Sequence, residues 1–187
     1  MRFTVSSTAL SSKLNALSRV INSKNSLPIL ADFLFDVQDN MLYLTASDSE
    51  NVMKSQLELN ESDGSGRFAI GNHDLLEAVK GFSEQPITFD IDMTSNIAKI
   101  SYQNGLFSLP IENADEYPQS QSITDGANEI VISNALLAEN INRSLFATAQ
   151  DELRPVMNGI YFDLTPDHLA VVASDGQQSA GWGCSVE

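Results

Sequence analysis

Cysteine is almost absent from this 187-residue sequence, which contains only Cys184. One thiol cannot form an intrachain disulfide, and with only His73 and His168 elsewhere it cannot complete a zinc site. No run approaches the roughly 18 apolar residues that span a bilayer, and the start, MRFTVSSTAL, lacks the apolar segment of a signal peptide. We therefore expect a cytoplasmic protein without membrane contact, metal or other cofactor.

Basic residues are scarce as well: ten Lys and Arg stand against 25 Asp and Glu, and the net charge is −15. Such a surplus of acid is unfavourable for nucleic-acid binding, which needs clustered positive charge. The distribution of the charges points the other way, because residues 1–31 contain no acid and four basic residues: Arg2, Lys13, Arg19 and Lys24. We interpret this segregation as one basic face on an acidic body; the alternative is a solvated helix of chance composition.

Signals of catalysis and of nucleotide binding are missing too. The glycines at 64–66 fall between two predicted strands, whereas a phosphate-binding loop joins a strand to a helix. Asp48 with Glu50, and Asp90 with Asp92, form carboxylate pairs that a strand would place on one face. Hydrolysis or phosphoryl transfer needs further ligands and a base or nucleophile from other elements, and the sequence offers none in a recognisable pattern. We expect a non-catalytic protein.

The sequence repeats itself. A shift of 127 residues superposes 2–48 on 129–175 without a gap and gives ten identities in 47 positions. One register maintained over this length indicates two copies of one structural unit. Asp48 recurs as Asp175, which predicts a turn cap shared by both copies and not a unique site.

Both copies show the same order of predicted elements. Alternating apolar residues predict a strand at 3–5, and apolar residues at helical spacing follow it. Between them, Ser6, Ser7 and Thr8 in the first copy, or Ser133 and Asn134 in the second, offer N-cap oxygens for a helix. After a proline, alternation predicts a hairpin over 33–46. The first copy continues with a helix capped by Asn72 and with further strands at 51–59, 67–70, 87–91, 97–102 and 106–109.

Amphipathic helices must cover a sheet, so this pattern predicts an α+β fold of repeated domains with antiparallel sheets outside and two helices on the inner face. We expect a complete first domain over 1–118, a linker at 119–127 and a partial second domain over 128–187. That second copy is too short for its later strands and second helix, which would fit a truncated or frame-shifted product.

An ordered series of short strings resembles the bacterial DNA sliding clamp, the beta subunit of DNA polymerase III. The series covers residues 1–176 and comprises MRFTV, LPIL at 27–30, LYLTASDSE at 42–50, LP at 109–110 with EYP at 116–118, LRP at 153–155 with NGI at 158–160, and ASDG at 173–176. The resemblance implies three such domains per subunit and a head-to-tail homodimer ring around double-stranded DNA. Such a ring would tether the replicative polymerase, be handled by a clamp loader, and touch DNA without regard to its sequence.

The resemblance also implies site residues. It places Lys24 and Gln150 in two loops that contact DNA, and we add Lys13, Arg19 and Arg143 because of their helix positions. For these three residues, ordinary surface charge is the alternative.

The family's subunit-interface edge strand corresponds to Phe107 and Leu109, for which plain core packing is the alternative. One wall of its partner-peptide pocket corresponds to Arg154, Met157, Ser174 and Gly176. After Gly176 the chain departs from the family, and the atypical tail from 177 shows no strand alternation. We therefore expect no regular strand in that tail.

A second function remains open at this point. An acidic, sheet-rich module that binds other proteins, without DNA binding, explains the repeat and the net charge equally well. It does not explain why the basic residues gather in the first 31 positions.

Overall fold

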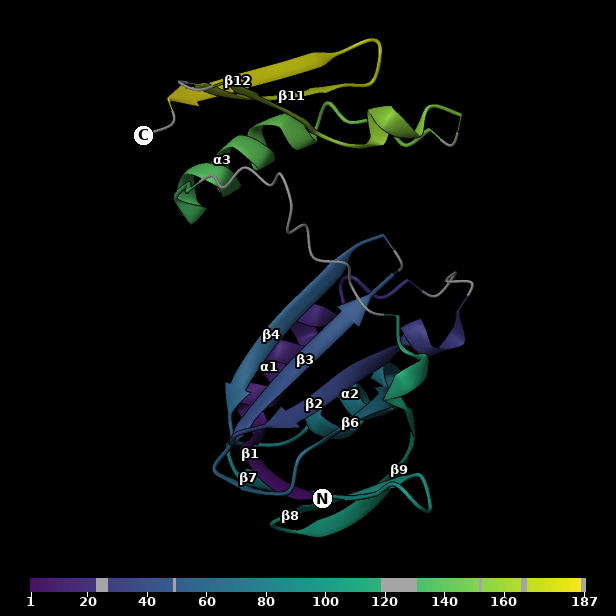
Figure 1. Ribbon diagram of the computed structural model, residues 1–187. Coiled ribbons are helices and arrows are strands. Elements are labelled where there is room, and N and C mark those ends of the chain that lie inside the picture. The colour runs from purple at the N-terminus through teal and green to yellow at the C-terminus, as the bar shows by residue number, and fades with distance from the viewer. Residues whose placement is uncertain (23–26, 49, 119–130, 152, 166–167, 186–187) are drawn as a thin grey trace. The chain divides into compact units, whose positions relative to one another are not determined.

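The computed structural model describes residues 1–22, 27–48, 50–118, 131–151, 153–165 and 168–185. The chain forms two compact units, residues 1–121 and 122–187, and each unit is described by itself (Figure 1). Among the described residues, no helix has both the length and the apolar character needed to cross a bilayer.

The described part of the first unit contains a nine-stranded antiparallel sheet in the order β4-β3-β2-β6-β9-β8-β7-β1-β5. The strands are β1 (Arg2–Ser6), β2 (Asp32–Gln38), β3 (Met41–Ser47), β4 (Val52–Glu58), β5 (Glu61–Asp63), β6 (Gly66–Gly71), β7 (Pro86–Asp92), β8 (Ile97–Tyr102) and β9 (Gly105–Asn113). Strand β5 was not among the predicted strands.

The sheet folds at two corners because two segments change partners along their length. Residues 105–110 of β9 pair with β8, and residues 111–113 pair with β6. In the same way β4 pairs with β3, and β5, which follows two residues later, pairs with β1. The two corners enclose an interior between the halves of the sheet.

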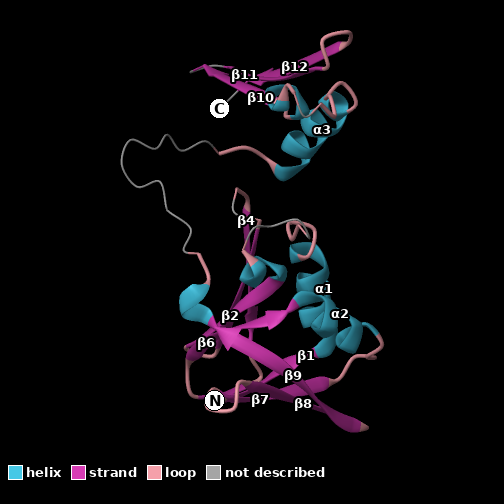
Figure 2. Ribbon diagram, turned by 90° about the vertical axis from the view of Figure 1, so that its right-hand side faces the viewer, coloured by secondary structure: helices cyan, strands magenta, loops and turns pink. Residues whose placement is uncertain are grey.

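Two helices cover this interior on one side of the sheet, as Figure 2 shows: α1 (Ser7–Leu17) and α2 (Asn72–Lys80). Ser6 caps α1 by accepting the Ala9 amide at 3.2 Å, as the sequence predicted. Helix α2 forms where the sequence predicted a helix, but the prediction of Asn72 as its N-cap was wrong. The N-cap is Gly71 without a side-chain bond, and Asn72 is the first helical residue, whose amide group instead donates to the Ala31 carbonyl.

The core of the first unit follows the predicted alternation. Alternate residues of β1, β3, β7 and β8 point inward and are buried, and they meet the apolar stripe of α1, which consists of Leu10, Leu14 and Leu17. Phe3 stacks on Phe89 with ring centroids 4.8 Å apart. The ring of Phe35 on β2 lies 6.1 Å from that of Phe89 between centroids, and this contact joins the two halves of the sheet through the interior.

The second unit contains α3 (Asn134–Leu145) and a three-stranded antiparallel sheet in the order β10-β11-β12. Its strands are β10 (Tyr161–Thr165), β11 (His168–Ser174) and β12 (Ser179–Ser185). Ser133 caps α3 by accepting the Leu136 amide, as predicted. The expectation of a tail without a strand was wrong, because β12 pairs with β11 along seven residues.

The correspondence between the two units at a shift of 127 residues therefore extends beyond the identical residues to the secondary structure. It maps β3 onto β11 and β4 onto β12 residue for residue, and the short 3-10 helix Pro28–Ala31 onto Pro155–Asn158. The second unit thus repeats α1, β2, β3 and β4 of the first.

Candidate functional site

Of the described basic residues in 1–31, Arg2 lies on β1 opposite Asp63 and Asp90, whereas Lys13 and Arg19 lie at α1. Lys13 is half-buried within the helix, and Arg19 is exposed just beyond its C-terminal end, where the helix dipole favours a cation. Among the described residues neither has an ion-pair partner. Their positive potential is therefore not neutralised locally. Lys24 lies outside the described residues.

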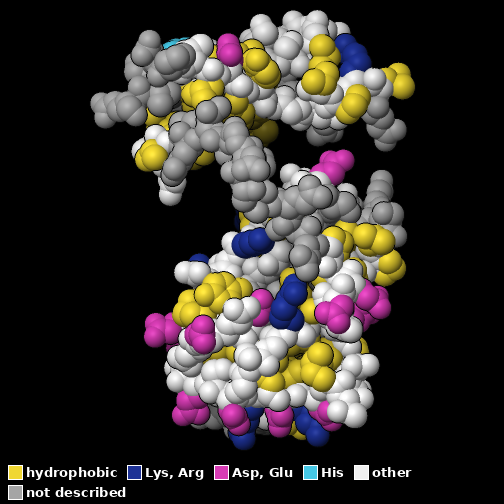
Figure 3. Space-filling view, in the orientation of Figure 1, with side chains coloured by type: hydrophobic (Ala, Val, Ile, Leu, Met, Phe, Trp, Pro, Cys, Tyr) yellow, Lys and Arg dark blue, Asp and Glu magenta, His cyan; other side chains and the backbone are white. Residues whose placement is uncertain are grey.

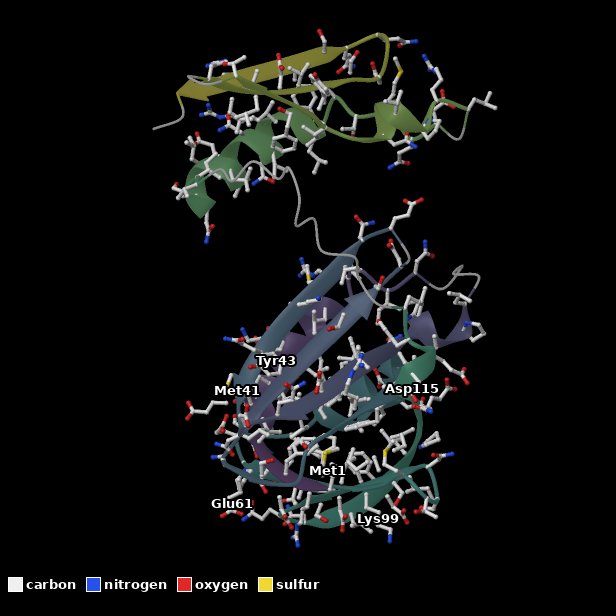
Figure 4. All side chains as sticks on the ribbon, in the orientation of Figure 1. Met1, Met41, Tyr43, Glu61, Lys99 and Asp115 are labelled. Atoms are coloured by element: carbon white, nitrogen blue, oxygen red, sulfur yellow. The ribbon has the colours of Figure 1, made fainter. Side chains whose placement is uncertain are left out.

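The sheet side of the first unit differs from α1 in its charge. In Figure 3 the face seen in Figure 1 carries acidic and basic side chains interspersed, without a continuous basic area. At one end of the unit Lys99 of β8, labelled in Figure 4, lies opposite Asp90 of β7. This sheet face therefore offers a phosphate backbone no concentrated attraction.

Arg143 has partners within its own unit. Its guanidinium forms an ion pair with Glu139 one helical turn earlier and lies over the ring of Trp182, 4.8 Å from the ring centroid. This cation–π contact joins α3 to β12. The sequence pattern did not indicate Trp182 as a partner, because the pairing of Trp182 with Val171 depends on the strand that was not predicted.

Gln150 is exposed in the loop after α3, in a hollow lined by Thr148, Ala149, Gln150, Asp151 and Asn158. The neighbouring Asp151 accepts a hydrogen bond from Arg154 Nε at 2.8 Å and another from the Leu153 amide at 2.8 Å. These bonds lower the pKa of Asp151 below its ordinary 3.8. Asp151 thus connects the loop of Gln150 to Arg154, which belongs to the predicted peptide pocket.

The four residues of the predicted pocket wall lie together. Gly176 has φ +89°, and a Cβ at this position would stand 3.1 Å from Arg154 Nη1 and 3.9 Å from Met157 Cε. Ser174 Oγ accepts the Gly176 amide at 3.1 Å and donates to the Gln178 carbonyl at 2.8 Å. A glycine at 176 therefore lets a guanidinium and a thioether approach the backbone, which gives a surface with both apolar and cationic character.

The predicted subunit-interface residues lie on β9. Phe107 packs in a partly buried aromatic group with Phe82 and Tyr102, at 6.2 Å from each ring. Leu109 is partly buried against the main core. Within the described part of the chain, residues 105–110 pair with β8 on one side, and no strand pairs with their other edge. An open edge of this kind can accept another strand.

One member of each carboxylate pair, Asp48 or Asp92, is bonded to a turn. Asp48 Oδ1 accepts the amides of Asn51 and Glu50 at 2.7 and 3.1 Å, and Asp92 Oδ1 accepts the Thr94 amide at 2.9 Å. Such bonds stabilise the ionised form, and they lower the pKa of both carboxyls below 3.8. A carboxylate with a lowered pKa that is already bonded to a turn is a poor general acid at neutral pH.

Comparison with known proteins agrees with this architecture. A family model described as the DNA polymerase III beta subunit, N-terminal domain, matches residues 1–121. The beta sliding clamp of Haemophilus influenzae is 28% identical over 192 residues, covering 100% of this chain and 50% of the relative. That of Synechocystis is 29% identical over 178 residues, covering 91% and 45% respectively.

Solved structures show the same fold. The DNA polymerase III beta subunit of Pseudomonas aeruginosa superposes with a TM-score of 0.90 at 24% identity, and that of Thermotoga maritima with 0.85 at 29%. Each match covers 100% of this chain and 50% of the solved one. The fold is thus that of a DNA clamp, with one complete domain and an incomplete second copy.

The chain belongs to the DNA polymerase III beta subunit family, the bacterial sliding clamps. It spans about half the length of the curated relatives that it matches. The acidic interaction module without DNA binding is not favoured by these matches.

Proposed function

We propose that this chain provides one and a half domains of a ring that surrounds double-stranded DNA and tethers the replicative polymerase. A tether of this kind needs no catalytic group, and its role places it in the cytoplasm. The observation that carries the proposal is the acid-free basic segment 1–31 in a chain of net charge −15, within a domain that matches the clamp family. The segregation gives DNA one attractive surface and repels it from the rest.

Contact with DNA is assigned to Lys13, Arg19 and Lys24 of the first unit, with Arg143 and Gln150 of the second in supporting roles. Because Arg143 already lies over Trp182, it contributes less than the residues of α1. The open edge at Phe107 and Leu109 joins a partner subunit in the ring.

The second unit contributes one wall of a site for partner peptides of the polymerase and the clamp loader, formed by Arg154, Met157, Ser174 and Gly176. In support of this assignment, Gly176 brings the Arg154 and Met157 side chains to one surface. The rest of that site belongs to parts that the relatives have beyond the length matched here.

Charge reversal tests the electrostatic proposal. Lys13→Glu with Arg19→Glu should weaken binding of the chain to duplex DNA about tenfold at low salt, because two phosphate contacts become repulsive. The slope of log affinity against log salt should fall by about 1.8. Fluorescence anisotropy with a labelled duplex measures both quantities.

The matched control changes the same charge on the sheet: Lys54→Glu with Lys99→Glu. This variant should retain most of the affinity for duplex DNA, because the two lysines lie on the sheet and not at α1. Any small loss of affinity then reflects only the change in net charge. If both double variants lose affinity equally, the segregation of charge has no role in DNA contact, and the proposal fails.

A further inference from the structure

A hollow of about 380 Å³ lies on the sheet of the first unit, over β2, β3, β4 and β6. The strand residues that line it alternate with buried core residues, so they point away from α1 and α2. This face is therefore opposite to the one assigned to DNA. We call it the outer hollow, and its lining consists of Leu34, Asp36, Tyr43, Thr45, Lys54, Arg67 and Pro118.

Two cations border the outer hollow at opposite ends. Lys54 on β4 lies opposite Thr45 on β3, and Arg67 on β6 lies opposite Asp36 on β2. Because β3 and β2 separate β4 from β6, the backbones of the two cations are about 14 Å apart across the sheet. Positive charge is therefore spread along the hollow and not gathered at one point.

The guanidinium of Arg67 is incompletely bonded. Its Nε is buried without a hydrogen-bond acceptor among the described residues, and Asp36 Oδ2, at 3.7 Å from Nε, is close enough for an ion pair but too far for a hydrogen bond. Both oxygens of Asp36 instead accept the side-chain amide of Gln38 at 2.8 Å. The Arg67 side chain is 38% exposed, so it retains donors for an acceptor that enters the hollow.

Between the two cations the outer hollow is largely apolar. Leu34 of β2 is buried, and Tyr43 of β3, labelled in Figure 4, is 41% exposed. Pro118 is exposed at the border of the same hollow. An exposed aromatic ring beside a proline offers a surface on which another ring or an aliphatic side chain can pack.

The fold itself does not require this chemistry. At the shift of 127 residues, Lys54 corresponds to Gly181 and Tyr43 to Ala170. The second unit thus repeats the strands of this face, but has neither the cation nor the aromatic ring at the two positions. Since the architecture is kept without these side chains, their presence in the first unit indicates a role beyond folding.

We propose that the outer hollow binds an acidic segment of another protein, in which an apolar side chain stands between two carboxylates. The carboxylates pair with Lys54 and Arg67, and the apolar side chain packs on Tyr43. Carboxylates on alternate residues of an extended peptide start about 7 Å apart, a separation that the long side chains of Lys54 and Arg67 meet by reaching inward.

Charge complementarity favours carboxylates over phosphate as the ligand. A polyphosphate concentrates its charge within a few ångströms, and two separated cations beside Asp36 neutralise such a charge poorly. Because the chain has a net charge of −15, an acidic peptide is repelled from most of the surface, and the outer hollow fixes where it binds. This inference does not depend on DNA binding.

NMR titration of the isotope-labelled 187-residue chain with the tripeptide acetyl-Asp-Phe-Asp-amide, at low salt and up to millimolar concentration, tests the proposal. Amide signals of β2, β3, β4 and β6 and the Nε–H signal of Arg67 should shift along one saturation curve. Acetyl-Asn-Phe-Asn-amide has the same shape without the charges and should bind at least about tenfold more weakly. Equal affinity for the two peptides, or no shift in these strands, would overturn the proposal.

Three variants locate the site. Lys54→Gln and Arg67→Gln should each weaken binding of the acidic peptide about fivefold. Lys54 is exposed, so Lys54→Gln tests the site without disturbing the fold. Lys99→Gln on β8 is the matched control, because it changes the net charge equally outside the hollow and should leave the affinity unchanged.

Two outcomes of these measurements would contradict the assignment. An equal loss of affinity in Lys99→Gln would mean that only the net charge attracts the peptide. Inorganic phosphate that saturates the same signals at lower concentration than the peptide would identify the hollow as a phosphate site, and the proposed protein partner would be wrong.

Discussion

At the scale of single residues, Asp32 stands out as an unfavourably placed carboxylate. It begins β2, its carboxylate has no hydrogen bond to a described residue, and its pKa is raised from 3.8 to about 6 by burial, with a smaller contribution from the charge of Glu112. Because the folded state binds its proton more tightly than the unfolded state, stability falls as the pH rises from about 4 to about 6. Asp32 therefore destabilises the first unit at neutral pH.

Asp32→Asn should remove this effect. A shift of about two pKa units corresponds to about 2.7 kcal/mol, which solvent screening of a half-exposed group reduces to about 1 kcal/mol. Urea unfolding should show that gain at neutral pH and no gain near pH 4, where the native carboxyl is protonated. Glu112→Gln, which removes the smaller cause of the raised pKa, should stabilise the unit less than Asp32→Asn does. An equal gain in the free energy of unfolding from Asp32→Asn at both pH values would contradict the ionic explanation.

At the scale of elements, the hairpin turn of β3 and β4 recurs between β11 and β12. Asp175 Oδ1 accepts the amides of Gln177 and Gln178 at 2.8 and 2.6 Å, as Asp48 does with its own turn, and these bonds lower the pKa of Asp175 below 3.8. The stabilisation of this turn by the ionised Asp175 is therefore present above pH 3.8 and is lost as the pH falls through the lowered pKa.

Asp175→Ala should speed amide exchange in β12 several-fold and leave β4 unchanged, because the turn holds β12 beside β11. Asp48→Ala should speed amide exchange in β4 and leave β12 unchanged. Hydrogen exchange read by mass spectrometry resolves the two strands; β12 exchange unaffected by Asp175→Ala would mean that strand pairing alone positions it.

These elements also show what the sequence could predict. The helix starts at Ser6 and Ser133 and the hairpin at 33–46 depend on local signals, namely capping oxygens and alternation, and the prediction was correct. Strand β12 contains Gly181 and Gly183 and has no alternation of its own. Its pairing with β11 and the turn at Asp175 specify it, and these are tertiary contacts that a local pattern does not contain.

The features of the candidate site can also be separated into those that the sequence predicts and those that it does not. The basic bias of 1–31 is a property of composition and is visible in the sequence alone. The convergence of Arg154, Met157 and Gly176 was expected only from a family resemblance, and the Arg143–Trp182 contact was not predicted. Each requires a strand or loop brought from elsewhere in the chain.

At the scale of the whole molecule, the two units differ in how much core they possess. The first buries apolar residues from eight strands and two helices in one cluster, whereas the described second unit buries few beyond Leu169, Val171 and Ala173. Because stability scales with buried apolar surface, residues 128–187 should be cleaved by protease and should exchange amides faster than residues 1–118.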